Sequence, residues 1–388
     1  MINKANLIKD KISFVINQKE FTPLHIPIFK GNEVKYVTDC IESNFVSSVG
    51  EYVNRFEEAI CNYTGCKYAI LTVNGTAALH IGLQLVDVTK DDEVLMPALT
   101  FIATANAVSY IGATPHFVDV DEKTLGVDAQ KLDNYLAEIS KMKDGECFNK
   151  QTGKKIKAIV PMHTFGHSVD MDALLEVTQK YNIEIVEDAA ESLGSFYKGT
   201  HTGNLGKVSA VSFNGNKIIT TGGGGCIITN DEELAKKAKH ITTTAKIPHK
   251  WEYEHDMVGY NYRMPALNAA LGLAQIEKLP KFIEQKRALA KKYKEAFKDL
   301  DGITFFTEPE YAHSNYWLNA IILDTPNKTL RDEILKITNE NGIMTRPIWK
   351  LMNHLEMFKE SPKMDLSVSK SLEYRVINIP SSAHLGES

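Results

Sequence analysis

Seven short apolar segments alternate with segments of helical periodicity between residues 67 and 230. Most of them are nearly continuous apolar runs, as expected for strands of a parallel sheet that helices cover on both faces. We expect strands at residues 67–73, 92–97, 114–120, 155–163, 183–189, 207–213 and 225–230, and helices at 75–86, 100–112, 128–140 and 170–182. The alternation predicts an α/β fold with a mostly parallel seven-stranded sheet in a large domain.

A different pattern begins near residue 260. Pro265 can occupy the first turn of a helix, and an apolar helical segment follows it. Strands near 303–306 and 316–323, a helix near 328–341 and a last apolar segment near 375–380 indicate a smaller α+β domain. We therefore expect an N-terminal extension at residues 1–25, a large domain at 26–264 and a small C-terminal domain at 265–388.

The segment 141–157 interrupts the α/β pattern because it is polar and rich in turn residues. Its lysines could form an anion-binding patch, but runs of charge are more often solvated. We predict a solvated loop between a helix and the next strand.

Charge and composition exclude several classes of protein. The 44 basic and 49 acidic residues give a net charge of −5, whereas nucleic-acid-binding domains usually carry a basic excess. No apolar run is long enough for a membrane span, and the N-terminus lacks the apolar core of a signal peptide. The 5 cysteines are odd in number and form no CxxC pair, which favours reduced thiols in the cytoplasm. We expect no nucleic acid and no membrane among the partners.

The stretch from Ser212 to Gly225, SFNGNKIITTGGGG, carries the most informative residues. Lys217 follows a predicted strand and has no acidic residue near it in the sequence. A lysine kept away from carboxylates can be partly neutral and form a Schiff base, although most lysines are solvated surface residues. The four glycines lead into a strand, unlike a dinucleotide-binding loop, and we interpret them as backbone that passes close to a bound planar molecule.

Asp188 ends an apolar strand in the segment IEIVEDAAES, at the edge where open α/β sheets bind ligands. A buried carboxylate needs a cationic or hydrogen-bonding partner, and a protonated pyridine nitrogen would serve. The alternative is that Asp188 caps a helix that begins with Ala-Ala-Glu.

Three further motifs contain polar or aromatic candidates. In VNGTAALHIGL, Gly75 and Thr76 lie between a strand and a helix, where free backbone N–H groups suit a phosphate. In PALTFIATANA, Phe101 could cover a flat ring or fill the core. In GYNYRMP, Asn261 and Arg263 precede a helix and could present polar groups to an anion.

Taken in order, the motifs GTAAL, PALTFIAT, EDAA, SFNGNK with TTGGGG, and GYNYRM closely resemble those of the DegT/StrS family of pyridoxal-phosphate-dependent nucleotide-sugar aminotransferases. The resemblance extends from about Ile26 to Ser381. It implies a fold-type-I enzyme with the aspartate aminotransferase fold, which binds pyridoxal phosphate in the large domain. It also implies a homodimer with shared active sites and no metal ion.

The resemblance assigns roles to residues at matching positions. Lys217 would form the internal aldimine with pyridoxal phosphate and move the proton during transamination. Asp188 would pair with the pyridine nitrogen, and Phe101 would stack on the ring. The phosphate would be held by Gly75, Thr76 and Ser212, and by Asn261 of the neighbouring subunit.

The chain departs from the common pattern at two positions. Relatives often have Gln or His where Glu191 stands, and His where Asn214 stands. Some members that eliminate a hydroxyl have His in place of the lysine, so Lys217 favours amino transfer. If a helix follows Asp188, Glu191 faces the same way and approaches the cofactor's ring oxygen, which should raise the pKa of Glu191. The alternative is a capping interaction at the helix start.

The segment NGIMTRPIWKLMNHL contains the candidates for substrate binding. Arg346 and Lys350 could bind a diphosphate or the amino donor's carboxylate, and Trp349 could pack on a nucleobase or sugar, or against a helix start. The motifs look most like the branch that aminates C4 of UDP-linked 2-acetamido-2,6-dideoxy-4-ketohexose, in bacillosamine and legionaminic-acid type pathways. A GDP- or dTDP-linked ketosugar is the alternative.

The implied reaction has two halves. L-glutamate leaves as 2-oxoglutarate and gives pyridoxamine phosphate, and the ketosugar then receives the amino group. Two other classes stay open, namely another fold-type-I enzyme such as a lyase or desulfurase, and a sensor that binds cofactor or sugar without turnover. For the desulfurase, Cys226 would be the nucleophile, but it lies in a predicted strand and should be buried.

Overall fold

A computed structural model describes residues 2–387, except the side chain of Ile2. Its large sheet has the order β1-β11-β10-β7-β6-β2-β3, with a hairpin attached at β6. Only β11 runs antiparallel to its neighbours along this path. The strands are β1 (Tyr68–Thr72), β2 (Asp92–Pro97), β3 (Thr114–Val118), β6 (Lys155–Ile159), β7 (Glu184–Asp188), β10 (Val208–Ser212) and β11 (Gly225–Thr229). The predicted mostly parallel α/β sheet is confirmed.

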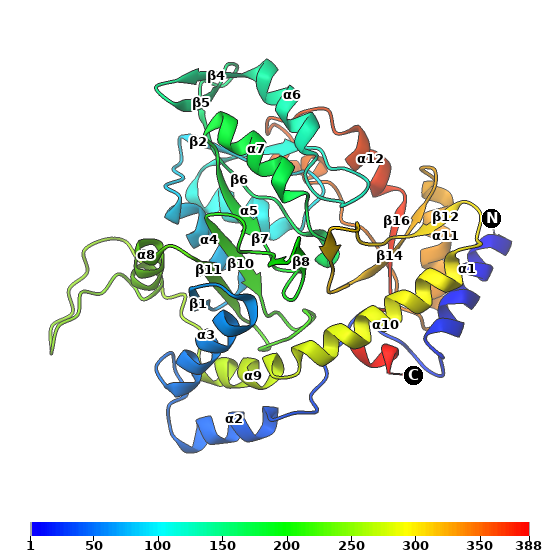
Figure 1. The fold of residues 1–388 in the computed structure, drawn as a ribbon, viewed down its shortest axis with the longest axis horizontal. Coiled ribbons are helices and arrows are strands. Elements are labelled where there is room, and N and C mark those ends of the chain that lie inside the picture. The colour runs from blue at the N-terminus through cyan, green and yellow to red at the C-terminus, as the bar shows by residue number, and fades with distance from the viewer. Residues whose placement is uncertain (1, 388) are drawn as a thin grey trace.

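Helices cover both faces of this sheet (Figure 1). On one face lie α4 (Gly75–Leu85), α5 (Ile102–Ile111) and α8 (Glu232–Thr242), and on the other lie α6 (Ala129–Ile139) and α7 (Met171–Tyr181). Within β2, Val94 and Met96 pack into the first layer and Leu95 into the second, because successive strand residues point to opposite faces. The near-continuous apolar strands therefore follow from burial on both sides.

The polar segment 141–157 is not the loop that the sequence predicts. It contains the hairpin of β4 (Ser140–Lys143) and β5 (Glu146–Asn149), and β5 pairs with β6. The side chains of Cys147 and Asn149 are buried, and Asn149 donates a hydrogen bond to the buried carboxylate of Glu93. Buried side chains alternate with more exposed ones along β5, but this alternation is too short to be recognised in a lysine-rich sequence.

The small sheet has the order β12-β14-β16-β15. Its strands are β12 (Ile303–Phe305), β14 (Asn319–Leu323), β15 (Arg346–Pro347) and β16 (Val376–Ile379), and the helices of this region are α10 (Leu279–Phe297), α11 (Lys328–Glu340) and α12 (Ser367–Glu373). Strands β12, β14 and β16 and helix α11 match the predicted elements, whereas β15 and α12 were not predicted. Helix α1 (Ile2–Val15) lies along α10 in Figure 1 and buries Ala5, Ile8 and Ile12 in the core of this region.

Several elements connect the two sheets. Helices α2 (Glu33–Glu42) and α3 (Glu51–Thr64) pack on α9 (Ala266–Ile276), and the long helix α10 continues from there to the small sheet (Figure 1). A third sheet joins β13 (Ala312–His313) to β8 (Phe196–Tyr197) and β9 (Thr200–His201). The division at residues 25 and 264 stays a prediction. Among residues 2–387, no helix has both the length and the apolar character to cross a membrane.

Candidate active site

A cavity of about 400 Å³ lies at the carboxyl ends of the parallel strands. The loops that follow β1, β2, β7 and β10 all leave the sheet at this edge, as ligand sites of open α/β sheets require. The cavity is lined by Asn74, Gly75, Thr76, Leu79, Phe101, Ala103, Met162, Asp188, Ala190, Glu191, Ser212, Asn214, Asn216, Lys217, Trp317 and Trp349. The structure thus brings together Gly75, Thr76, Phe101, Asp188, Glu191, Ser212, Lys217 and Trp349, which the sequence singles out.

Lys217 lies in the loop after β10, and its amino group faces two side chains. Nζ is 3.2 Å from Oε1 of Glu191 and 3.9 Å from the ring centroid of Trp317. Only 12% of the lysine side chain is exposed. The expectation that Lys217 stands away from carboxylates is wrong, because the turn after β7 brings Glu191 to it in space.

Asp188 is the last residue of β7, and its carboxylate is buried in the cavity wall. The hydroxyl of Thr104 donates to Oδ2 at 2.6 Å, and the N–H of Ala190 donates to Oδ1 at 3.2 Å. Burial raises the pKa of Asp188, so a positive partner in the cavity would stabilise its charged form. Turns, not a helix, follow Asp188, so the helix-cap alternative is wrong.

Glu191 lies in these turns, close to both Asp188 and Lys217. Its Oε2 accepts a hydrogen bond of 2.9 Å from the N–H of Phe165, and burial raises the pKa of the carboxyl to about 7. The direction is the one expected from the sequence, but the largest cause is burial. Because no helix starts here, helical spacing does not place Glu191, and the capping alternative is wrong.

The first turn of α4 forms an anion-binding end of the cavity. Oδ1 of Asn74 caps the helix by accepting from the N–H of Ala77 at 2.8 Å, which leaves the N–H groups of Gly75 and Thr76 at the helix end. Ser212 lies opposite, so near that a Cβ at Gly75 would stand 2.9 Å from Cβ of Ser212. This cradle and the buried Asp188 at the other end fit the phosphate and the ring nitrogen of pyridoxal phosphate.

The last glycine of the run has a different role from the one predicted, and for the other three the close approach to a planar molecule stays a prediction. A Cβ at Gly225 would lie 2.4 Å from the backbone carbonyl carbon of Asn74. This glycine therefore lets β11 pass close to the turn before α4, and the close approach is to backbone instead of to a planar ligand.

Aromatic side chains form the outer wall of the cavity. The ring centroid of Trp349 lies 6.3 Å from that of Phe101 and 5.1 Å from that of Phe165. Phe101 is 47% exposed, so its ring is not core filling. Trp349 follows β15, and its neighbour Phe101 is the N-cap residue of α5, so packing at a helix start stays open beside a role in binding.

Three predicted residues lie outside the lining of the cavity in the single chain, namely Asn261, Arg346 and Lys350. All three side chains are exposed. Oδ1 of Asn261 accepts from the guanidinium of Arg263 at 3.0 Å, and Arg346 donates to Oδ1 of Asn339 at 3.1 Å. Their roles in binding stay predictions.

Cys226 is fully buried in β11, as the sequence predicts. Burial raises the pKa of its thiol well above the usual value. A thiol of this kind is inert, so nothing in the geometry supports a cysteine nucleophile.

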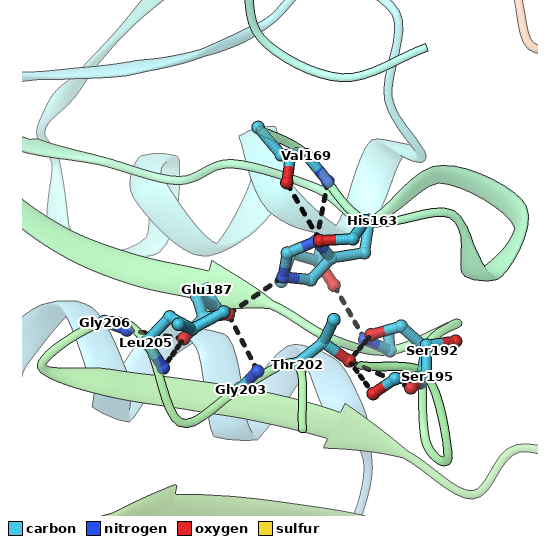
Figure 2. Close-up of polar contacts among 12 residues, drawn as sticks. His163, Val169, Glu187, Ser192, Ser195, Thr202, Gly203, Leu205 and Gly206 are labelled. Atoms are coloured by element: carbon cyan, nitrogen blue, oxygen red, sulfur yellow. Dashed lines mark hydrogen bonds and ion pairs between the residues drawn. The ribbon is translucent and has the colours of Figure 1, made fainter. Parts of the chain in front are cut away.

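A buried network behind the cavity holds the strand end that carries Asp188. Glu187 accepts a hydrogen bond of 2.9 Å from Nε2 of His163. It also accepts bonds of 2.7, 2.7 and 2.5 Å from the N–H groups of Gly203, Leu205 and Gly206 (Figure 2). The N–H of Val169 donates to Nδ1 of the same histidine, which fixes the proton on Nε2. Burial alone would raise the pKa of Glu187, but the hydrogen bonds from His163 and the backbone lower it.

Replacing Glu187 with glutamine should lower the free energy of unfolding of the cofactor-free protein at pH 7 by about 3 kcal/mol, since an amide cannot accept from all these donors. Folding lowers the pKa of the Glu187 carboxyl. The stabilisation that this carboxylate provides is therefore fully present above its unfolded pKa of about 4.3 and is lost as the pH falls through its folded pKa. Urea unfolding at pH 7 and below pH 4 measures both effects. Glu184→Gln, at the less buried start of β7, is the matched control, and equal stability of the two variants would contradict the prediction.

Residues 27–388 match the model of the DegT/DnrJ/EryC1/StrS aminotransferase family. The chain belongs to this family. It is 36% identical over 365 residues to a GDP-perosamine synthase of Caulobacter vibrioides, with 93% of each protein covered. It is 35% identical over 362 residues to a GDP-perosamine synthase of Escherichia coli O157:H7, again with 93% of each covered.

Solved structures of the family have the same fold. A DegT DnrJ EryC1 StrS aminotransferase from Brucella abortus superposes with a TM-score of 0.82 at 26% identity and covers 91% of each chain. The protein is thus a fold-type-I aminotransferase with pyridoxal phosphate as its cofactor, as predicted.

Proposed function

We propose that this DegT-family protein transfers an amino group from L-glutamate to the keto carbon, C4, of a nucleotide-linked 4-keto-6-deoxy sugar. One observation carries the proposal: a single cavity holds the amino group of Lys217, the buried carboxylate of Asp188 and the open end of α4. These are an amine, a negative charge and an anion cradle, which are the groups that a pyridoxal-phosphate aminotransferase needs.

Each residue contributes a distinct step. Pyridoxal phosphate, when bound, supplies a ring that takes up electrons from the donor's α-carbon. The N-terminus of α4 and Ser212 bind its phosphate, and Asp188 keeps a proton on its ring nitrogen. Lys217 would hold the cofactor through its amino group, and the same amino group would take up and deliver the proton at the donor's α-carbon and at C4 of the sugar. Phe101 and Trp349 cover the cavity and exclude water.

The identity of the nucleotide is a more specific part of the proposal. The sequence motifs favour a UDP-linked 2-acetamido sugar, whereas two relatives that align over 93% of this chain are GDP-perosamine synthases. Their names favour the GDP-linked ketosugar, which we place first. Arg346 and Lys350, exposed beside Trp349, are the candidates for its diphosphate.

The test is turnover with L-glutamate and each of three ketosugars, linked to GDP, UDP or dTDP. Formation of 2-oxoglutarate together with the amino sugar, seen by mass spectrometry, supports the proposal, and the highest kcat/KM identifies the nucleotide. Multiple-turnover release of free ammonia from glutamate, without an amino sugar, would indicate a lyase. Sugar binding without 2-oxoglutarate would indicate a sensor, and either result overturns the proposal.

Glu191→Gln should keep activity but change two pH profiles. Because folding raises the pKa of Glu191 from 4.5 to about 7, the folded state binds more protons between these values, and the stability of the cofactor-free parent falls as the pH rises through that window. Glutamine removes this slope. It should also shift the pH dependence of the bound cofactor's visible absorbance. Thermal unfolding at pH 5 and 7.5 and a spectral titration check this, and two profiles identical to the parent's would refute it.

We also propose a homodimer in which Asn261 reaches the cofactor phosphate of the partner subunit. In the single chain this residue is exposed and lies away from the cavity lining, which supports a role across an interface. An equimolar mixture of Asn261→Ala and Lys217→Ala chains should regain up to about a quarter of parent activity, because a mixed dimer contains one site free of both changes. An active monomer in sizing at low micromolar concentration would contradict the dimer.

A further inference from the structure

Trp317 lies against the amino group of Lys217, although no motif of the sequence singles it out. It stands just before β14, on the side of the small sheet, and only 4% of its surface is exposed. Nζ of Lys217 is 3.9 Å from the ring centroid, within the range of a cation–π interaction. The indole N–H donates to the carbonyl of Asn216, the residue next to the lysine, at 2.7 Å.

The position of this ring is fixed from several sides. The N–H of Trp317 donates to Oδ1 of Asn315 at 2.7 Å, and Nζ of Lys286 donates to its carbonyl at 3.1 Å. The side-chain amide of Asn315 also donates to the carbonyl of Glu191 at 2.9 Å. The two groups that contact the lysine's amino group, Glu191 and Trp317, are therefore connected through one asparagine.

We propose that Trp317 is a positioning residue for Lys217: with Glu191 it forms a resting place for the lysine's amino group whenever that group is not bound to the cofactor. Transamination releases this group in each half of the reaction, and it has to stay near the cofactor to move protons and to rebind. An ammonium is attracted to the face of an indole ring and to a carboxylate. The inference rests on the proposed role of Lys217.

Fluorinated tryptophan provides the decisive test, since fluorine weakens the negative face of the ring with little change in shape. The rate at which Lys217 recaptures the cofactor, followed by stopped-flow absorbance, should fall stepwise with the number of fluorines, by about 3- to 10-fold in total. The same replacement in a Trp317→Phe background should have no such trend, which controls for Trp251 and Trp349. A purely structural tryptophan would give no dependence on fluorine in either background, and that result overturns the inference.

Two further variants separate the ring face from the indole N–H. Trp317→Phe keeps an aromatic face and should stay within about 3-fold of the parent, whereas Trp317→Leu should lose about 10-fold. Equal losses in both variants would contradict the proposal.

Acetylation of the cofactor-free protein is a second measurement. The labelling of Lys217 relative to the surface residue Lys180, measured by peptide mass mapping, should rise about 3-fold or more in Trp317→Leu because the ring no longer shields the amine. Unchanged labelling would also contradict the proposal.

Borohydride reduction of the holoenzyme distinguishes a failure of the proposed function from a failure of the role of Trp317. If the cofactor is not trapped on Lys217, the proposed function fails. If it is trapped there and the fluorine series is flat, only the role of Trp317 fails.

Discussion

Replacing Lys217 with alanine should lower transamination by more than about 1,000-fold and abolish the visible absorbance of the lysine-bound cofactor. The amino group is both the covalent attachment point and the group that moves the proton, and among residues 2–387 no other lysine lines the cavity. The fold should be unaffected, because the hydrogen bond and the cation–π contact of this side chain both involve Nζ and no backbone group.

The control for this variant is Lys180→Ala, a partly exposed lysine on α7 that pairs with Asp133. It should behave like the parent in both assays, since a surface ion pair contributes little. Near-parental turnover of Lys217→Ala, or borohydride trapping of the cofactor on another lysine, would show that the assignment is wrong.

Replacing Asp188 with asparagine should lower kcat by about 100- to 1,000-fold while the cofactor still binds. A neutral amide cannot hold the proton on the ring nitrogen, because it lacks the opposite charge that favours the protonated ring. The hydrogen bond from Thr104 can persist, since the amide oxygen accepts in place of Oδ2.

The stability of this variant distinguishes a catalytic from a structural carboxylate. Burial raises the pKa of Asp188, so the buried carboxylate lowers the stability of the cofactor-free fold at pH values above its unfolded pKa. Asp188→Asn should therefore melt at the same temperature as the parent or higher when no cofactor is present. A large loss of stability with normal turnover of the holoenzyme would show that Asp188 is a structural residue.

The sequence by itself determined the seven strands along the main path of the large sheet and the residues at their carboxyl ends, but not the hairpin of β4 and β5. The apolar runs of the seven strands and the residues at or after their carboxyl ends, including Gly75, Asp188 and Lys217, are local features. In a parallel sheet the carboxyl ends lie at one edge, so these residues converge whatever the details of packing. The spacing of Ala5, Ile8 and Ile12 fits the helical period of α1, although only an N-terminal extension was predicted there from the sequence.

Only the tertiary structure decided what surrounds the lysine. Glu191 is 26 positions from Lys217 in the sequence, and Trp317 is 100 positions away, yet both contact its amino group. The turn after β7 replaces the expected helix because Glu191 is held by the N–H of Phe165 and by Asn315, which come from two distant loops. The contacts of Asn315 and Trp317 form only when the small sheet packs on the large one, whereas those of Phe165 and Glu191 form between segments that follow different strands of the large sheet. None of them is visible in the local periodicity of the sequence. The raised pKa of Glu191 has the same origin. It results mainly from burial in the packed structure and not from the residues next to Glu191 in the chain.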